Sequence, residues 1–352
     1  MKVLIITPNI PEYRYEVYQM LAREVDLTIL HNGKEINKSE IQFKQIFSQL
    51  NRLGPFTYLG VKLNTLCKKF DVIISEANIR HIDRNLLILK SNRTYKWISW
   101  GIGVSASYEK KFDSDNSLDW IRHYILKRAD ANVFYSNYPV NKYIKAGFPQ
   151  KSLYVANNTT YVSYEENIQY NKNKILFVGT LYKQKRIYEL LRSYHEASKI
   201  FQDIVPLDII GSGAEYESIK NWIKKNNLDE KIKLLGPIFD PSLLEEHFRT
   251  AYACISPGQA GLSVLTSMGY GTPYITMKEA ITGGEIFNIH ENDNGILYDS
   301  DDELKNIILD ICRNPNKFIV MGLKAREYYL KNRKVKDMVN GLKEAINYVV
   351  NK

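Results

Sequence analysis

Short apolar runs alternate with amphipathic stretches along this chain. In the first half, apolar runs at residues 3–7, 26–31, 70–75, 95–100, 129–136 and 151–156 predict strands, and residues 15–23 and 138–146 predict helices. In the second half, strands are predicted at 175–178, 207–210, 231–236 and 251–256, with helices following the first two. Strands that alternate with helices in this way predict parallel sheets covered on both faces.

The length and one polar stretch predict where the chain divides. A chain of 352 residues is longer than one hydrophobic core usually fills, so we expect two domains. Residues 157–174 are Asn-rich and lack a clear period, which is typical of a linker. We therefore expect an N-terminal Rossmann-like domain over residues 1–160, a second over 161–334, and a C-terminal helix within 335–352.

The composition is that of a globular protein without membrane spans. Hydrophobic residues make up 44% and charged residues 25%, and no run approaches the roughly 20 apolar residues that a membrane helix needs. The five-residue apolar run at the N-terminus is too short for a signal peptide, so we expect a cytoplasmic protein. Cys67, Cys254 and Cys312 form no Cys-x-x-Cys pair and are expected to be buried thiols.

The net charge of +9 has several interpretations. A basic protein can bind nucleic acid or anionic lipid, or be soluble because of its charge. No nucleic-acid motif or zinc spacing is present, so we expect no nucleic-acid partner. Residues 118–128 mix Trp, Ile and Leu with basic side chains, and such a helix can lie on an anionic membrane. The alternative is an ordinary amphipathic helix packed on its own domain.

Residues 256–275 combine a small-residue loop, an apolar helix and a Gly-x-Pro exit into a strand. Gly258 and Gly261 leave room for a ligand to touch the main chain. Pro257 and these glycines predict a helix that begins near Gly261, whose first-turn N–H groups suit a diphosphate. An ordinary strand-loop-helix corner would carry the same glycines.

A basic turn that follows the strand at 175–178 is the second candidate segment. Gly179 ends this strand, and Lys183, Lys185 and Arg186 come before an amphipathic helix. Ammonium and guanidinium groups both bind phosphate, so this turn is a second candidate for a diphosphate site. A solvated basic turn is the alternative.

These two segments resemble the donor-binding motifs of GT-B glycosyltransferases of the group 1, or family 4, type. The family pattern Glu-Gly-x-Gly-x-x-x-x-Glu-Ala-Met-Ala-x-Gly-x-Pro aligns from Gly261 through Gly271 and Pro273, but both glutamates are missing, at Gly258 and Thr266. The pattern Val-Gly-Arg-Leu-x-x-x-Lys-Gly retains Lys185 but has Thr180 for the arginine and Arg186 for the last glycine. Asn294-Gly-Ile-Leu297 resembles the family's Asn-Gly-x-Leu. The resemblance implies two Rossmann-like domains whose parallel sheets face each other across a cleft, and a final helix that packs on the first domain.

The resemblance and the turn positions together give a set of candidate site residues. We expect the diphosphate at Gly179, Thr180, Lys185, Arg186, Ala260, Gly261 and Leu262, and the nucleotide at Gly211, Ser212, Gln259, Ser263 and Thr266. We expect the donor sugar at Gly283, Gly284 and Glu285, and the acceptor at Glu12, Tyr13, Arg14, Gly101, Ile102 and Gly103. Lys185 and Glu12 are the candidate catalytic residues. No metal site and no cofactor are expected.

The implied activity is transfer of a hexose or deoxyhexose from a UDP- or GDP-sugar to a saccharide or lipid-linked saccharide acceptor. The resemblance further implies bacterial surface-polysaccharide synthesis on the inner face of the membrane. We expect retention of configuration, in which the departing phosphate takes the acceptor proton. Inversion would need a base such as Glu12, Glu109 or Asp113. A non-catalytic subunit that supports a partner enzyme and a nucleotide-sugar epimerase are the alternatives.

Overall fold

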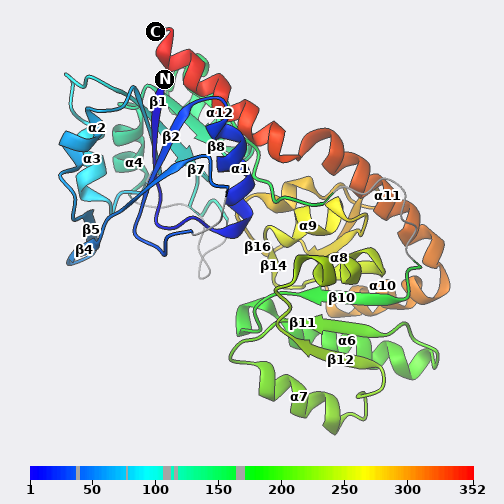
Figure 1. The fold of residues 1–352 in the computed structure, drawn as a ribbon. Coiled ribbons are helices and arrows are strands. Elements are labelled where there is room, and N and C mark those ends of the chain that lie inside the picture. The colour runs from blue at the N-terminus through cyan, green and yellow to red at the C-terminus, as the bar shows by residue number, and fades with distance from the viewer. Residues whose placement is uncertain (37–39, 77, 106–111, 115–117, 164–170) are drawn as a thin grey trace. The chain divides into compact units, whose positions relative to one another are not determined.

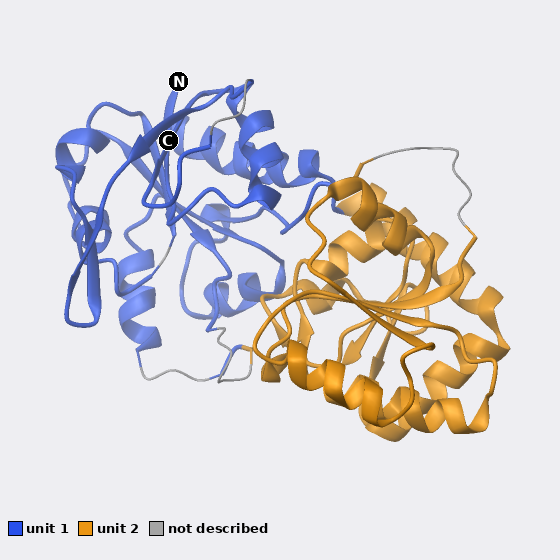
Figure 2. Ribbon diagram, turned by 60° about the horizontal axis from the view of Figure 1, so that its bottom comes forward, with its two compact units in different colours: residues 1–105, 113–161, 333–352 blue, residues 106–112, 162–332 orange. Residues whose placement is uncertain are grey.

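The structure is a computed structural model that describes residues 1–36, 40–76, 78–105, 112–114, 118–163 and 171–352. It divides into two compact units (Figure 2). Unit 1 comprises Met1–Ser105, Asp113–Tyr161 and Arg333–Lys352, and unit 2 comprises Val162–Asn332 together with 106–112. The chain thus passes between the units near residues 105, 113, 161 and 333.

Unit 1 is built on a seven-stranded sheet whose strands are all parallel. Its order is β3 (Lys44–Phe47), β2 (Asp26–His31), β1 (Lys2–Ile6), β6 (Val72–Glu76), β7 (Lys96–Gly101), β8 (Ala131–Phe134) and β9 (Leu153–Val155). All six strands predicted for this half are present. β3 and the hairpin of β4 (Leu50–Leu53) and β5 (Phe56–Leu59) escaped prediction, because their side chains are mostly half-buried or exposed and form no apolar run.

Helices cover both faces of this sheet (Figure 1). They are α1 (Glu12–Ala22), α2 (Leu63–Cys67), α3 (Ile82–Ile88), α4 (Asp119–Leu126), α5 (Tyr138–Lys145) and α12 (Val335–Val350). α12 buries an apolar stripe against β8, β9 and α1, so the end of the chain completes the core of unit 1. α1 begins at Glu12 rather than at Tyr15, so the predicted loop residues 12–14 form its first turn.

Only Leu126 of α4 is fully buried, whereas Trp120 is 69% and Tyr124 is 55% exposed. In the part of the chain that the structure describes, no helix is both long enough and apolar enough to span a bilayer.

Unit 2 is built on a six-stranded parallel sheet. Its order is β12 (Ile232–Gly236), β11 (Leu207–Ile210), β10 (Lys174–Val178), β13 (Ala251–Ile255), β15 (Tyr274–Met277) and β17 (Gly295–Tyr298). The packed helices are α6 (Ile187–Ile200), α7 (Tyr216–Lys225), α8 (Pro241–Arg249), α9 (Ser263–Gly269), α10 (Asp301–Arg313) and α11 (Pro315–Asn332). A two-stranded ladder of β14 (Gln259–Ala260) and β16 (Ile281–Thr282) extends beyond the sheet.

The strand order gives each unit a topological switch point. In unit 2 the chain runs from β10 to β11 and β12 on one side, and then to β13, β15 and β17 on the other. In unit 1 the same change of direction occurs between β1 and β6. Ligands of open parallel sheets bind outside the carboxyl ends of the two strands at such a point. A ligand of unit 2 is therefore expected after the ends of β10 and β13.

Candidate functional site

Lys185 lies at the carboxyl end of β10. Gly179 follows β10, and the 3₁₀ turn Lys183–Lys185 brings the lysine side chain back over it. A Cβ atom on Gly179 would lie only 3.0 Å from Lys185 Nζ, so glycine leaves the space that the ammonium group uses. Lys185 is 8% exposed, and this burial lowers its pKa to about 8. The turn thus holds a nearly buried amine at the switch point of unit 2.

Arg186 has two structural roles beside Lys185. Its backbone is left-handed, with φ 54°, at the position where the family has a glycine, a residue that adopts this conformation without strain. Its guanidinium pairs with Glu189 on α6. The neighbouring Thr180 is exposed and Lys183 is exposed, so Lys185 is the buried cation of this turn.

The loop after β13 packs backbone against backbone on the same turn. The Gly258 amide donates to the Lys185 carbonyl at 3.1 Å, and the Ile281 amide donates to the Gly258 carbonyl at 2.9 Å. A Cβ atom on Gly258 would lie 2.1 Å from the Gln184 carbonyl oxygen, a clash with main chain. The position of the first family glutamate therefore has no room for any side chain in this structure.

Two tyrosines fix the segment that follows Gly258. The Tyr182 hydroxyl donates to Gln259 Oε1 at 2.8 Å, and the Tyr274 hydroxyl donates to the Gln259 carbonyl at 2.9 Å. Ser263 Oγ lies 2.9 Å from the Tyr274 hydroxyl. Tyr274 is fully buried, which raises its pKa, so it remains a neutral donor. Sequence reasoning missed both tyrosines, although Tyr182 lies between Gly179 and Lys185 in the motif.

The start of α9 leaves open space in front of its first turn. The helix begins at Ser263, two residues later than predicted. A Cβ atom on Gly261 would have only Gln259 Nε2 near it, at 3.9 Å. Leu262 and Ser263, which follow it, are half-buried. Thr266 is also half-buried, and its hydroxyl donates to the Leu262 carbonyl at 3.2 Å, which leaves its oxygen free to accept. In this first turn the Val264 and Leu265 amides donate to the Gly261 and Leu262 carbonyls at 3.0 Å, so an anion would be met by the amides that precede them.

The turn after β11 packs directly on the turn after β10. The Leu181 amide donates to the Ser212 carbonyl at 2.8 Å, and a Cβ atom on Gly211 would lie 1.9 Å from the Gly179 carbonyl oxygen. Gly211 and Ser212 therefore support the Gly179 turn. Their direct contact with a nucleotide stays a prediction.

The predicted sugar-binding loop has its carboxylate turned inward. Glu285 is 6% exposed, and its Oε2 accepts from the Gly283 amide at 2.9 Å. Thr282 Oγ1 accepts from the amides of Gly284 and Ile286. The loop is thus shaped by its own carboxylate, and a role in sugar binding stays a prediction.

The predicted acceptor residues of unit 1 divide into exposed and buried ones. Glu12 and Tyr13 are exposed at the first turn of α1. Arg14 is 5% exposed; its guanidinium donates to Asn158 Oδ1 at 2.6 Å and lies 5.0–5.3 Å from the ring centroids of Tyr13, Trp100 and Tyr135. Arg14 therefore holds the N-terminal end of α1 in place.

The other acceptor candidates surround the end of β7. Gly101 is the last residue of that strand, Ile102 follows it half-buried, and Gly103 has φ 81° with the Phe134 ring 2.6 Å from where its Cβ would lie. Asp113 pairs with Lys142 and Tyr138, and Glu109 lies outside the described residues.

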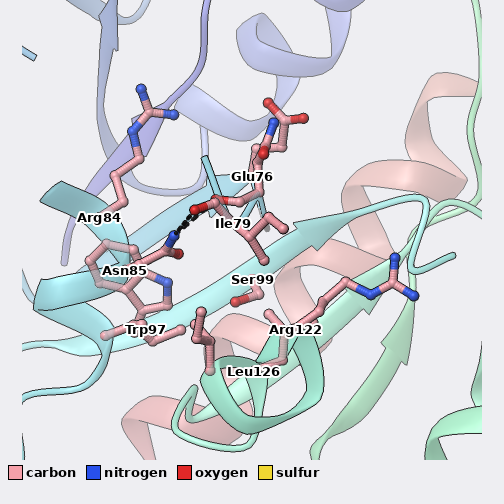
Figure 3. A pocket seen from close by; sticks show the side chains of 11 residues that line it. Glu76, Ile79, Arg84, Asn85, Trp97, Ser99, Arg122 and Leu126 are labelled. Atoms are coloured by element: carbon pink, nitrogen blue, oxygen red, sulfur yellow. Dashed lines mark hydrogen bonds between the residues drawn. The ribbon is translucent and has the colours of Figure 1, made fainter. Parts of the chain in front are cut away.

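A narrow pocket with a volume of about 10 Å³, no more than a single water molecule needs, lies within unit 1 between the sheet and helices α3 and α4 (Figure 3). Asn85 lines one side of the pocket, where its side-chain amide donates to the carbonyls of Asn78 and Ile79 at 3.1 and 3.0 Å. Glu76 lies at one end of the pocket, and its carboxylate points away from Ser99 and Leu126 (Figure 3). The prediction from sequence ended this strand at Ser75 and missed Glu76.

Over the described residues, no group of three or more His, Cys, Asp or Glu side chains is arranged to hold a metal ion.

Comparison with known sequences connects unit 2 to one family. Residues 163–334 match the model of the glycosyl transferases group 1. The chain is 27% identical over 191 residues to an uncharacterized glycosyltransferase of Methanocaldococcus jannaschii, covering 51% of this chain and 46% of that protein. It is 32% identical over 104 residues to the GtfA subunit of a UDP-N-acetylglucosamine–peptide N-acetylglucosaminyltransferase of Limosilactobacillus reuteri, covering 30% of this chain and 20% of that protein. The chain spans about half the length or less of the curated relatives it matches.

Solved structures of the same fold cover the whole chain. Anabaena HepE in complex with UDP superposes with a TM-score of 0.73 at 14% identity, covering 99% of this chain and 100% of that one. Sucrose-phosphate synthase from Thermosynechococcus elongatus superposes with a TM-score of 0.71 at 16% identity, covering 99% of each chain. At such identities the likeness concerns the fold alone, and the predicted GT-B fold is confirmed.

Proposed function

The chain has the GT-B fold and carries a group 1 glycosyl transferase domain over residues 163–334, and from this premise we propose that it transfers a sugar from a nucleotide-diphosphate donor to a saccharide acceptor. The observation that carries the proposal is the switch point of unit 2. Lys185, Gly179 and the open first turn at Gly261 come together there, after the ends of β10 and β13.

These groups supply what a leaving diphosphate needs. Negative charge develops on the diphosphate as the sugar departs, and preorganised donors aimed at that charge commonly make the largest contribution to catalysis. The ammonium of Lys185 offers a charge-assisted hydrogen bond, and the amides at the start of α9 offer more. Because these groups already carry positive charge, we propose that the reaction needs no metal ion and no cofactor beyond the donor. Activity that is unchanged by EDTA is the expected result.

We propose a UDP- or GDP-hexose or deoxyhexose as donor. HepE has been solved with UDP-glucose, and this supports trying UDP-glucose first. For the acceptor we propose a glycan or lipid-linked glycan of a bacterial surface polysaccharide, with the protein in the cytoplasm and peripheral on the inner face of the membrane. The lipopolysaccharide outer core galactosyltransferase WaaB has the same fold, and α4 exposes Trp120 and Tyr124 beside basic side chains.

We propose retention of the anomeric configuration. In such a reaction the departing phosphate takes the proton of the acceptor hydroxyl, and no protein base is required. Because no protein base is required, retention is compatible with the missing first family glutamate at Gly258, where the backbone of Gln184 fills the space. Proton nuclear magnetic resonance of the product identifies the anomer directly.

The experiment is an assay of nucleotide release from a panel of UDP-, GDP- and CMP-sugars, with saccharide acceptors present. Lys185→Ala is expected to lower the rate by ~100-fold or more, as when one charge-stabilising donor is removed. Lys183→Ala is the matched control, because Lys183 lies on the same turn but is exposed. Equal rates for the two variants would contradict the assignment of Lys185 to the diphosphate site.

The missing glutamates favour one other function, a non-catalytic subunit that binds donor without using it. Gly258 has no side chain and Thr266 offers only a hydroxyl at the two positions. Binding of a nucleotide sugar without release of nucleotide from any donor in the panel would support the subunit and contradict the enzyme.

A further inference from the structure

Unit 1 has its own topological switch point, and Glu76 stands beside it. The chain runs from β1 to β2 and β3 on one side of the sheet, and then to β6 and onward on the other. Ligands of open parallel sheets collect at the carboxyl ends of the two strands that flank such a point, here β1 and β6. Glu76 is the last residue of β6, and its side chain is 46% exposed. A ligand in this place would therefore meet a carboxylate.

His81 lies near Glu76 and favours the charged form of its carboxylate. His81 Nε2 lies 3.8 Å from Glu76 Oε2, and His81 Nδ1 lies 2.8 Å from Thr57 Oγ1. The Thr57 amide donates to the Arg80 carbonyl at 2.8 Å, so strand β5 anchors the loop that carries His81. The His81 imidazole and, after it, the buried Arg84 guanidinium lower the pKa of Glu76 below its usual value. The β4–β5 hairpin, which the sequence did not predict, thus holds His81 near the carboxylate.

The other strand at the switch point adds groups of matching chemistry. The segment after β1 presents the exposed Glu12 and Tyr13, and Tyr13 is 40% exposed. Arg14, the cation in this segment, is buried among aromatic rings and bonded to Asn158. Carboxylates accept hydrogen bonds from hydroxyl groups and repel anions, so these surroundings suit an uncharged polyol.

We propose that Glu76 accepts hydrogen bonds from the hydroxyl groups of an uncharged saccharide and so orients the acceptor, an inference that rests on the proposed transferase function. Glu76 is an acceptor-binding residue in this role.

The test compares Glu76→Gln with Asp71→Asn in the full-length chain. Asp71 lies just before β6, at the opposite end of the same strand, where its Oδ2 accepts from the Lys2 amide at 2.7 Å, and asparagine keeps that oxygen. Saturation-transfer nuclear magnetic resonance measures the binding of methyl glycosides of glucose, galactose, mannose and N-acetylglucosamine. Calorimetry measures the binding of UDP separately.

Glu76→Gln is expected to weaken binding of the glycoside that the wild type binds best by about 10- to 100-fold, since hydrogen bonds to a charged acceptor are lost. Asp71→Asn is expected to bind it as the wild type does, and UDP affinity is expected to be unchanged in both. Equal glycoside binding by wild type and Glu76→Gln, or no binding of any glycoside by the wild type, overturns the inference. Absence of UDP binding by the wild type contradicts the proposed transferase, an outcome distinct from both.

Discussion

The affinity of the protein for UDP is expected to fall as the pH rises from 7 to 9, because Lys185 loses the proton that makes it a phosphate ligand. Burial lowers the pKa of Lys185 to about 8 in the free protein. If only the protonated amine binds diphosphate, the apparent dissociation constant grows as 1 + 10^(pH − 8). This gives a loss of about tenfold between pH 7 and pH 9, or ~1.4 kcal/mol.

Titration calorimetry with UDP at pH 7, 8 and 9 measures this change. Lys185→Arg is the matched variant, because a guanidinium stays protonated over this range and its profile is expected to be flat. Ionisation of UDP itself affects both proteins alike and cancels in the comparison. A wild-type affinity that does not change with pH, or that changes in parallel with the variant, refutes the assignment of Lys185 to the diphosphate.

The same pKa shift affects folding in the opposite direction: as the pH rises, UDP affinity falls but the free energy of unfolding increases. The unfolded chain holds a proton on Lys185 up to pH 10.5, whereas the folded chain releases it near pH 8. Between these values the unfolded state binds more protons, so the contribution of Lys185 to the free energy of unfolding increases with pH. Deprotonation of Lys185 therefore does not unfold the protein, and it cannot lower UDP affinity over pH 8–9 in that way.

Three further predictions concern single substitutions. Gly261→Ala is expected to leave the melting temperature unchanged, because the added Cβ meets only a side-chain nitrogen at 3.9 Å, and to weaken UDP binding, because the methyl group fills space in front of the first turn of α9. Gly258→Ala is expected to lower the melting temperature, because its Cβ would lie 2.1 Å from a main-chain oxygen. Thr266→Glu, which restores the family residue, is expected to change the calorimetric affinity for the donor but not the melting temperature, because Thr266 is half-buried on α9. Lys172→Ala is expected to lower stability to chemical denaturation by ~1–3 kcal/mol, since its ammonium donates to three backbone carbonyls at 2.7–3.3 Å.

The order of strands and helices was predictable because buried parallel strands appear as short apolar runs. The runs at 26–31 and 207–210 coincide with β2 and β11 for this reason. Residues 44–59 gave no such signal, since β3 and the β4–β5 hairpin expose much of their side chains. Prediction failed here because these strands are only partly buried, which leaves no continuous apolar pattern.

The candidate site was predictable at the level of its turns but not of its contacts. Gly179 and Lys185 belong to one local motif, so their proximity follows from a strand and a turn. The contact of Gly258 with Gln184 joins distant segments and depends on β10 lying beside β13. The inward turn of Glu285 depends likewise on the Gly283 amide, which a sequence pattern does not reveal.

The two missing glutamates are physically different departures from the family pattern. At Thr266 the helix surface is half-exposed, so a longer side chain fits and its absence affects only what the site can bind. At Gly258 the chain touches the turn that carries Lys185, and the Gly258 amide bonds the Lys185 carbonyl at 3.1 Å. A glutamate there would have to displace that turn, and the ammonium of Lys185 with it. In this structure the same backbone contact therefore closes the position of the first glutamate and holds the turn that carries Lys185, so only the second glutamate can be restored without moving that turn.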